Sequence, residues 1–422
     1  MADKYNVLVI GGGGREHAIV WSLSKSPLVN KLYCLPGNAG IAELAECEDI
    51  AATDIDGILA FLERHKDINY VVVAPDDPLA MGLVDILNEK GYMTFGPTKA
   101  AAMIESSKAF AKGLMKKYNI PTADYQVFDN YDDALNYLKT AKYPLVVKAD
   151  GLALGKGVTI CQDYETAKIA LTDMMINKKF GSSGDKAVIE EFLQGFEVSV
   201  LAFTDGETLI PMPPSQDHKR AFDQDQGPNT GGMGTFAPSP KFTKEMQEKA
   251  YREIFLPTIK ALKAEGRSFS GVIFFGLIVN GADIKVLEYN ARFGDPETQS
   301  VLPLLKTDLF EIFLAVNQKK LNQINIEWSD KSAVCVVMAS GGYPGGYQKG
   351  YPIEIGELDE NIIVFHAGTA VKDSRLVTNG GRVLGVTAVA QDLKTARELA
   401  YKNVQKIKFQ DAHFRKDIGI KL

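Results

Sequence analysis

Cysteine is scarce in this chain of 422 residues, and no two of its four thiols form a C-x-x-C pair. The thiols are scattered, each in or near an apolar stretch, at Cys34, Cys47, Cys161 and Cys335. Disulfide frameworks and zinc-thiolate sites need numerous or closely spaced cysteines, so both are disfavoured and buried free thiols are expected. Such a composition suits a reducing compartment, and we expect a cytoplasmic protein.

Long apolar runs and excess positive charge are also lacking. No run approaches the roughly 20 apolar residues of a membrane span. The first residues lead through Asp3 and Lys4 into a strand without the apolar core of a signal peptide. The formal net charge is −6, and no Ser/His/Asp or Cys/His spacing favours a nucleophilic hydrolase. We therefore expect a monomer that binds small molecules, with neither nucleic acid nor membrane as a partner.

The length implies two to four domains. The first hundred residues alternate apolar strands with helical stretches, which is typical of a doubly wound parallel sheet. Ligands bind such sheets at the carboxyl ends of the strands, so the turns to examine are 11–14, 36–40 and 75–78. Later in the chain we expect helices at 106–118, 244–264 and 308–316, and strands at 271–279 and 285–290.

The stretch 213–238 has almost no apolar periodicity, which favours a functional or disordered segment. A smaller α+β unit follows from about residue 331, and Asn379-Gly380-Gly381 is a hairpin signal. We therefore predict an α/β and α+β multidomain protein with domains at 1–103, 104–330 and 331–422.

Four glycines, Gly11 to Gly14, follow the first strand and precede a helix. Backbone N–H groups at such a turn can approach an anion, and the helix N-terminus adds partial positive charge. The dinucleotide fingerprint G-x-G-x-x-G is not met because position 16 is Glu. A phosphate-bearing ligand is favoured, with NAD as the weaker alternative and a plain tight turn as the structural one.

A second glycine-rich turn, at 149–157, lies between two expected strands. Lys148 on the first strand could reach a nucleotide phosphate, and Gly151, Gly155 and Gly157 would let a loop with Lys156 at its tip close over phosphates. A plain hairpin explains this segment nearly as well. The strand at 188–193 ends in acids, of which Glu190 could face an adenine edge, although most acids at strand ends are simply solvated.

The tract at 215–234 gathers one acid and two bases, Asp217, Lys219 and Arg220, before an Asn-Thr-Gly-Gly-Met-Gly run that can offer backbone amides to an anion. His218 fits a hydrogen-bonding loop residue better than a metal ligand. Further on, an apolar strand carries Glu288 and Asn290 two positions apart, so both point to one face. Two oxygen ligands suit Mg²⁺, but a strand that ends in a polar turn explains this pair equally well.

In combination, these segments resemble the ATP-grasp ligases and, among them, the glycinamide ribonucleotide synthetase (phosphoribosylamine–glycine ligase) family. The resemblance covers essentially the whole chain. It rests on Gly-Gly-Arg-Glu-His-Ala (13–18), Pro-Gly-Asn-Ala-Gly (36–40), Lys-Ala-Asp-Gly-Leu-Ala (148–153), Gln-Asp-His-Lys-Arg (216–220), Gly-Pro-Asn-Thr-Gly-Gly-Met-Gly (227–234), Arg-Phe-Gly-Asp-Pro-Glu (292–297) and Thr-Asn-Gly-Gly-Arg-Val (378–383).

This resemblance implies ligation of glycine to 5-phosphoribosylamine with ATP, through a glycyl phosphate, as the second step of purine synthesis. It implies a central ATP-grasp domain with a mobile lid at about 124–193. The metal, Mg²⁺ or Mn²⁺, would be held by Glu288 and Asn290. ATP would be bound by Lys108, Lys148, Gly151, Gly155, Lys156, Gly157, Glu190, Glu191, Phe192, Leu193 and Glu197. The catalytic residues would be Arg292, Asp295, Asp217 and Lys219, and the ribosylamine would be bound by Gly12, Gly13, Gly14, Asn38, Asp76, Gly231 and Gly232.

Two positions depart from the family's pattern. Gly12 replaces an Asn of the first glycine loop, and Asp76 replaces the Glu of a Gly-Pro-Glu tract, so we expect a water or backbone group to replace individual ribosylamine contacts there. The competing hypotheses are another ATP-grasp ligase, a nicotinamide dehydrogenase built on the first hundred residues, and a nucleotide-binding regulator without turnover.

Overall fold

Five parallel strands form the N-terminal sheet, in the spatial order β3-β2-β1-β4-β5. The computed structural model describes residues 4–153 and 156–420. The strands are β1 (Tyr5–Gly11), β2 (Val29–Pro36), β3 (Glu46–Cys47), β4 (Tyr70–Val73) and β5 (Met93–Phe95). Alternate residues of β1 enter two apolar cores: Leu8 packs with α2 (Ile55–Arg64) and α4 (Leu83–Glu89), and Val9 packs with α1 (Gly14–Leu23). The predicted doubly wound sheet is therefore confirmed.

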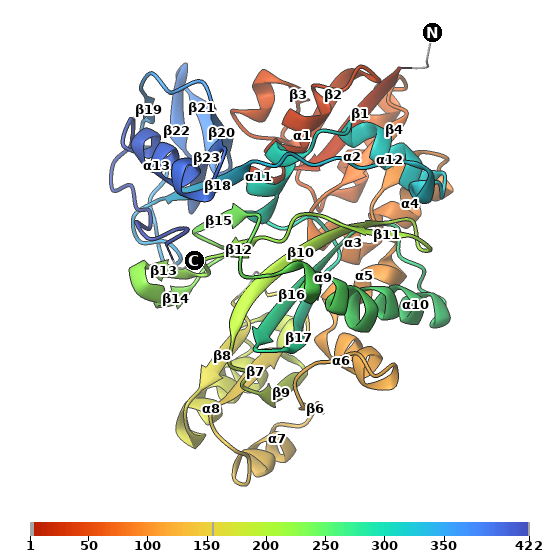
Figure 1. Ribbon diagram of the computed structural model, residues 1–422, viewed down its shortest axis with the longest axis vertical. Helices are drawn as coiled ribbons and strands as arrows, with labels where there is room; N and C mark the ends of the chain where they lie inside the picture. Colours follow the sequence, from red (N-terminus) through yellow and green to blue (C-terminus); the bar gives the residue numbers. More distant parts are fainter. Residues whose placement is uncertain (1–3, 154–155, 421–422) are drawn as a thin grey trace.

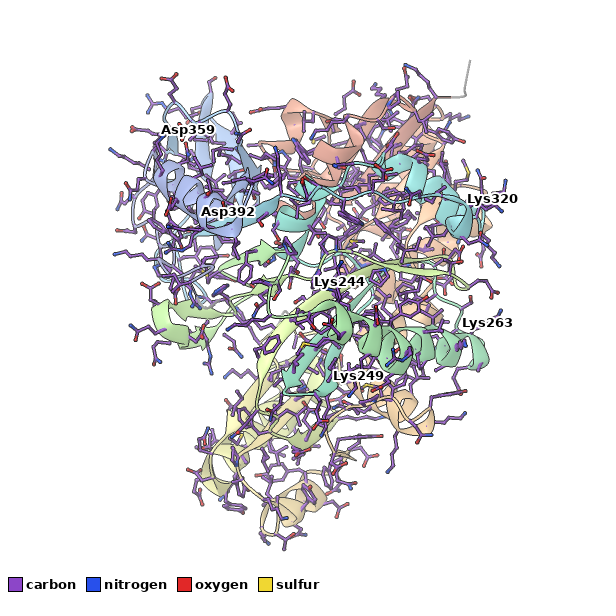
Figure 2. All side chains as sticks on the ribbon, in the orientation of Figure 1. Lys244, Lys249, Lys263, Lys320, Asp359 and Asp392 are labelled. Atoms are coloured by element: carbon purple, nitrogen blue, oxygen red, sulfur yellow. The ribbon has the colours of Figure 1, made fainter. Side chains whose placement is uncertain are left out.

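The middle of the molecule contains an antiparallel sheet in the order β11-β10-β16-β17. Its strands are β10 (Phe196–Thr204), β11 (Leu209–Pro211), β16 (Gly271–Asn280) and β17 (Asp283–Asn290). One face is covered by a continuous helical run, made of α9 (Lys244–Ala250), a π-helical turn (Tyr251–Phe255) and α10 (Leu256–Ala264). Lys249 of α9, labelled in Figure 2, donates to the Ala282 carbonyl in the turn between β16 and β17.

A second antiparallel sheet, in the order β6-β9-β7-β8, extends away from the rest at the lower end of Figure 1. It has its own apolar core, which it shares with two helices. Its elements are β6 (Tyr125–Phe128), α7 (Tyr131–Leu138), β7 (Leu145–Ala149), β8 (Val158–Cys161), α8 (Tyr164–Leu171) and β9 (Ala187–Glu191). This core lies within the segment that we predicted to be a lid.

One further sheet joins the central and C-terminal parts of the chain, in the order β12-β15-β18-β23-β20. Its strands are β12 (Gln216–Asp217), β15 (Gly234–Ala237), β18 (Ser332–Ala339), β20 (Ile362–His366) and β23 (Arg382–Ala390), and α13 (Leu393–Val404) packs on it. The domain boundary that we propose at 330/331 therefore falls between strands of a single sheet, since β12 and β15 precede it and β18, β20 and β23 follow it.

One local expectation needs correction, and two others can be stated more closely. Asn379–Gly381 is not a hairpin turn, because β22 (Arg375–Thr378) pairs with β21 (Thr369–Lys372), whereas β23 pairs with β18 and β20. Gly380 instead packs against the Gly368 backbone. The segment 213–238 is ordered, and it includes β13 (Arg220–Phe222) paired with β14 (Gln226–Asn229). The helix expected at 106–118 is α6 (Lys108–Lys117), which Ser107 separates from α5 (Lys99–Ser106).

No helix within the described ranges has both the length and the apolar character needed to span a bilayer. The remaining elements that matter for the site are α3 (Asp76–Met81), which begins directly after β4, α11 (Glu297–Val301) and α12 (Leu309–Asn317).

Candidate functional site

The break between α5 and α6 fixes the position of Lys108. Ser107 caps α6, and its hydroxyl donates to the Asp150 carboxylate at 3.1 Å. In the first turn of α6, Lys108 Nζ donates to the Gly151 carbonyl at 3.0 Å. Burial lowers the pKa of Lys108. The cap therefore places this ammonium group at the start of the glycine-rich loop.

Glu190 lies buried between two lysines rather than at an open edge. It pairs with Lys148 of β7, and its other carboxylate oxygen is 2.5 Å from Lys112 Nζ of α6. Burial alone would raise the pKa of Glu190, but the two ammonium groups lower it below its usual value. Lys148 Nζ also donates to the Leu287 carbonyl at 3.2 Å. Glu190 therefore orients Lys148, and Lys112, which the sequence did not single out, shares its charge.

Glu288 and Asn290 lie on β17, at the edge of the central sheet. The pairing with β16 contains a bulge, since Val286 lies opposite Leu277 and Glu288 opposite Gly276. Lys219 Nζ is 3.1 Å from Glu288 Oε1. This ammonium group lowers the pKa of Glu288 to about 2, so the carboxylate is ionised at neutral pH.

These two side chains fit a divalent cation with few protein ligands. Asn290 Nδ2 donates to Glu105 Oε1 at 2.9 Å, which leaves the amide oxygen as the atom able to ligate a cation. Residues 4–153 and 156–420 contain no group of three or more His, Cys, Asp or Glu side chains that could hold a metal. A carboxylate and an amide oxygen alone suit Mg²⁺, which completes its shell with water and substrate phosphates.

Glu105, at the end of α5, is a buried residue that the sequence did not single out. Besides Asn290, it accepts from the Ala291 N–H at 2.7 Å and pairs with Arg292 Nη2 at 2.9 Å. It therefore connects the candidate metal ligand to the predicted carboxylate clamp. An acid at the end of an amphipathic helix carries no sequence signal of such a role.

Arg292 faces Asp76, which follows β4, with Nη2 and Oδ2 3.9 Å apart. Burial raises and the neighbouring Arg292 lowers the pKa of Asp76, and the net shift is downward. Arg292 Nε is buried and has no hydrogen-bond acceptor within the described residues. A buried N–H group without a partner calls for an acceptor, and a carboxylate is the natural one for a guanidinium group.

The first glycine loop is closely packed, and some of its backbone groups already have partners within the chain. A Cβ at Gly12 would lie 2.4 Å from the Gly37 carbonyl oxygen, so no side chain fits there without a backbone shift. Asn38 Nδ2 donates to the Gly12 carbonyl at 2.9 Å. The Gly13 N–H donates to Glu16 Oε2 at 2.7 Å. The Gly13 N–H is therefore already paired with a carboxylate of the same segment.

Two acids, Asp217 and Glu297, lie near each other, and Glu297 also lies near Arg292. Asp217 accepts from the His218 N–H at 2.6 Å, and Ser199 Oγ donates to Glu297 Oε1 at 3.2 Å. Burial and the nearby Glu297 raise the pKa of Asp217 well above its usual value, and burial raises that of Glu297. Such a pair either retains a proton or needs a cation, as two close carboxylates do not both ionise readily.

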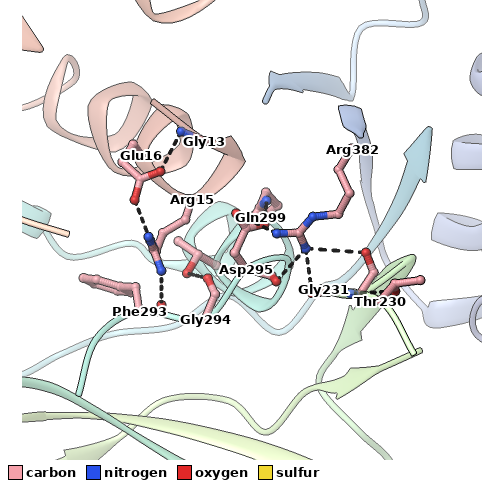
Figure 3. Close-up of polar contacts among 12 residues, drawn as sticks. Gly13, Arg15, Glu16, Thr230, Gly231, Phe293, Gly294, Asp295, Gln299 and Arg382 are labelled. Carbon is pink, nitrogen blue, oxygen red and sulfur yellow. Dashed lines mark hydrogen bonds and ion pairs between the residues drawn. The ribbon is translucent and has the colours of Figure 1, made fainter. Parts of the chain in front are cut away.

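Asp295 connects three segments (Figure 3). It accepts from Gln299 Nε2 at 2.7 Å and pairs with Arg382 Nη2 at 3.3 Å. A Cβ built on Gly13 would lie 3.4 Å from Asp295 Oδ2. Gln299 in turn packs against Gly14. The first glycine loop therefore lies against the segment that follows Arg292.

The other residues predicted to bind ATP lie in the glycine-rich turn, at the end of β9 and on β10. Lys156 Nζ donates to the Pro344 carbonyl at 3.4 Å, and the Ala149 N–H donates to the Gly157 carbonyl at 2.8 Å. Gly155 lies outside the described residues. Glu197 is 3.4 Å from Lys219, Glu191 is 3.7 Å from Lys285, and Phe192 and Leu193 follow β9.

The structure thus brings the predicted residues into two adjoining groups. The first group is Glu288 with three ammonium groups, those of Lys219, Lys148 and Lys108, which lie close enough to lower its pKa. Arg292, Asp76 and Asp295 form the second group, which the first glycine loop adjoins. Such a pair of groups can hold a polyphosphate beside a carboxylate, the arrangement needed to phosphorylate that carboxylate.

Three family models match consecutive parts of the chain. They are described as the phosphoribosylglycinamide synthetase N domain (residues 5–105), ATP-grasp (A) domain (106–298) and C domain (333–421). Phosphoribosylamine–glycine ligase of Caldanaerobacter subterraneus is 50% identical over 413 residues, which cover 98% of this chain and 99% of the relative.

Two solved structures have the same fold. The crystal structure of phosphoribosylamine–glycine ligase from Thermotoga maritima has a TM-score of 0.84 and 34% identity, and it covers 98% of this chain and 100% of that chain. The biotin carboxylase domain of 2-oxoglutarate carboxylase from Hydrogenobacter thermophilus has a TM-score of 0.77 at 16% identity, covering 98% and 92% respectively. The second likeness concerns the fold alone.

Proposed function

This chain belongs to the phosphoribosylglycinamide synthetase family, and we propose that it ligates glycine to 5-phosphoribosylamine with ATP, giving glycinamide ribonucleotide, ADP and phosphate. One observation carries the proposal: Glu105 joins Asn290 of the candidate metal site to Arg292, whose buried Nε has no acceptor among the residues that the structure describes. A triphosphate and an amino-acid carboxylate can therefore be held side by side.

The first step joins a glycine carboxylate oxygen to the γ-phosphorus of ATP, and ADP leaves. Arg292 holds the carboxylate, while Lys108 and Lys148 hold the phosphates. Glu288 and Asn290 would hold Mg²⁺ or Mn²⁺, which supplies charge neutralisation on the phosphates when bound. Lys219 would then share Glu288 with the ion. Glu190 to Leu193 and Glu197 are proposed to line the adenosine site.

The second step joins the ribosylamine nitrogen to the carbonyl carbon of glycyl phosphate. Inorganic phosphate leaves with the former carboxylate oxygen, and the nitrogen loses one proton. Asp217 and Asp295 are proposed to orient the glycine ammonium group. The ribosylamine would lie against Gly12, Gly14, Asn38, Asp76, Gly231 and Gly232, and closure of the segment with Gly151, Lys156 and Gly157 would exclude water from the acyl phosphate.

Oxygen transfer tests this reaction directly. With glycine labelled by ¹⁸O in its carboxylate, one label should appear in the released phosphate, as detected by mass spectrometry. Release of unlabelled phosphate would show that no glycyl phosphate forms. We further propose that the protein works as a cytoplasmic monomer, and light scattering after size exclusion checks its mass.

A further inference from the structure

Arg382 is the first residue of β23 and lies in a tract, Thr378–Val383, to which the reaction assigns no role. Its Nη1 donates to the Gly231 carbonyl at 2.6 Å and to the Asp295 carbonyl at 2.7 Å (Figure 3). Its Nη2 is 3.3 Å from Asp295 Oδ2. One guanidinium group thus bridges the Gly231 loop (229–234) and the Arg292 turn (291–297), which are more than fifty residues apart in the chain.

The backbone of Arg382 is held by contacts on both sides of β23. Its backbone pairs with Ala339 of β18, and its carbonyl accepts from the Gly368 N–H at 2.9 Å. A second residue from the same part of the chain supports the Gly231 loop, since the Gly231 N–H donates to Tyr343 Oη at 3.1 Å. The C-terminal segment therefore binds both the N–H and the carbonyl group of Gly231.

The Arg292 turn is also held from its opposite side. Arg15 Nη1, from α1, donates to the Phe293 carbonyl at 3.2 Å. Arg15 Nε pairs with Glu16 Oε1 at 2.6 Å, and Glu16 accepts from Gly13. Two arginines from opposite ends of the chain therefore fix carbonyl groups two residues apart, and Figure 3 shows both.

We propose that Arg382 is a positioning residue, through which the C-terminal segment holds the glycine and ribosylamine sites in their productive arrangement. The inference rests on the proposed function for the identity of the two substrates. Among the described residues, the Arg382 guanidinium group bonds to the Gly231 loop and the Arg292 turn. None of these partners is Lys108, Lys148, Glu288 or Asn290. Its loss should therefore weaken the use of glycine and ribosylamine while ATP binding is retained.

The test compares R382M and R382K with wild type and with R375M, a control at an exposed position of β22. For R382M we expect kcat/KM for glycine and for 5-phosphoribosylamine to fall roughly 10- to 100-fold, the worth of hydrogen bonds from a charged donor. The dissociation constant of a non-hydrolysable ATP analogue should change by less than about 2-fold, which is within the error of its measurement. R382K, which keeps the charge but lacks the planar fork of the guanidinium group, should be intermediate.

Amide hydrogen exchange provides a readout that needs no turnover. Exchange at 230–234 and 293–299 should quicken in R382M and remain unchanged in R375M. Unchanged exchange and unchanged kcat/KM in R382M would overturn the inference, and so would parallel losses of analogue binding and thermal stability. If wild type itself fails to ligate glycine, the proposed function is wrong, while the exchange result still decides whether Arg382 fixes these segments.

Discussion

The Glu105 carboxylate lies 2.9 Å from the Arg292 guanidinium group, and the Glu105 side chain is buried. Asn290 and the Ala291 N–H donate to the same carboxylate. Burial raises the pKa of Glu105, and Arg292 opposes that shift. This contact fixes the distance between the proposed metal ligand and the proposed carboxylate clamp. A substitution that breaks the contact should therefore disturb both.

Replacing Glu105 by Gln should raise the KM for glycine roughly 10-fold, because a hydrogen bond with a charged partner is lost. The amide keeps the shape of the side chain, but one of its ends becomes a donor that faces another donor. Steady-state kinetics with glycine varied measures the effect. Glu89→Gln, at an exposed position of α4, is the control and should leave the KM unchanged.

Replacing Glu288 by Ala should abolish ligation and leave the fold intact. The loss of a metal ligand at the phosphates removes several kcal/mol of charge stabilisation, so we expect a fall in kcat of roughly 1000-fold. Titration with Mn²⁺ in the presence of ADP, followed by electron paramagnetic resonance, should show weakened binding. Asp283→Ala on the same strand is the control, and near-normal activity of Glu288→Ala would remove this residue from the metal site.

Replacing Lys112 by Met should weaken the binding of ATP roughly 10-fold without affecting adenosine. The remaining pair of Glu190 and Lys148 would be neutral, so less positive charge would face the phosphates. Calorimetry with both ligands separates this electrostatic effect from damage to the fold, which would weaken both equally. Lys116→Met, at an exposed position of the same helix, serves as the matched control.

Three buried histidines should make the protein sensitive to mild acid. Burial lowers the pKa of His17 to about 3, and it lowers those of His218 and His366 to about 4. In the unfolded chain these histidines take up a proton near pH 6.5. Their contribution to the free energy of unfolding is therefore fully present above that pH. It decreases as the pH falls toward 4, by up to about 1.4 kcal/mol per pH unit for each histidine.

Urea unfolding at several pH values measures this slope. His17→Asn should reduce it, because the amide oxygen can still accept from the His366 N–H but does not titrate. Identical slopes in the variant and the wild type would contradict the assignment of His17 as a buried neutral side chain.

Much of the architecture could be predicted because it follows from local patterns. The strand and helix alternation gives the N-terminal sheet, and the motifs around Lys148, Glu288 and Arg292 indicate the ATP-grasp resemblance. Asn379–Gly381 misled because turn chemistry depends on which strands pair, and Gly380 is required by the close approach of Gly368 instead.

The residues that were missed act over long separations in the chain. Glu105 meets Asn290 across 185 positions, and Arg382 meets Gly231 across 151. Glu105 lies in no tract that indicated chemistry, and the tract 378–383 contributed to the resemblance without a role for Arg382. Glu190 shows a related limit: its position on β9 was predictable, but its pairing with Lys112 depends on how α6 packs against the sheet.

The central claim is that the chain couples ATP cleavage to the joining of glycine and 5-phosphoribosylamine. The most direct measurement is ADP release by the purified protein with Mg-ATP and each substrate in turn, with the product identified by mass spectrometry. Release should require both glycine and 5-phosphoribosylamine and should yield glycinamide ribonucleotide in equal amount. Turnover that is supported by bicarbonate alone, or that proceeds without glycine, would contradict the account.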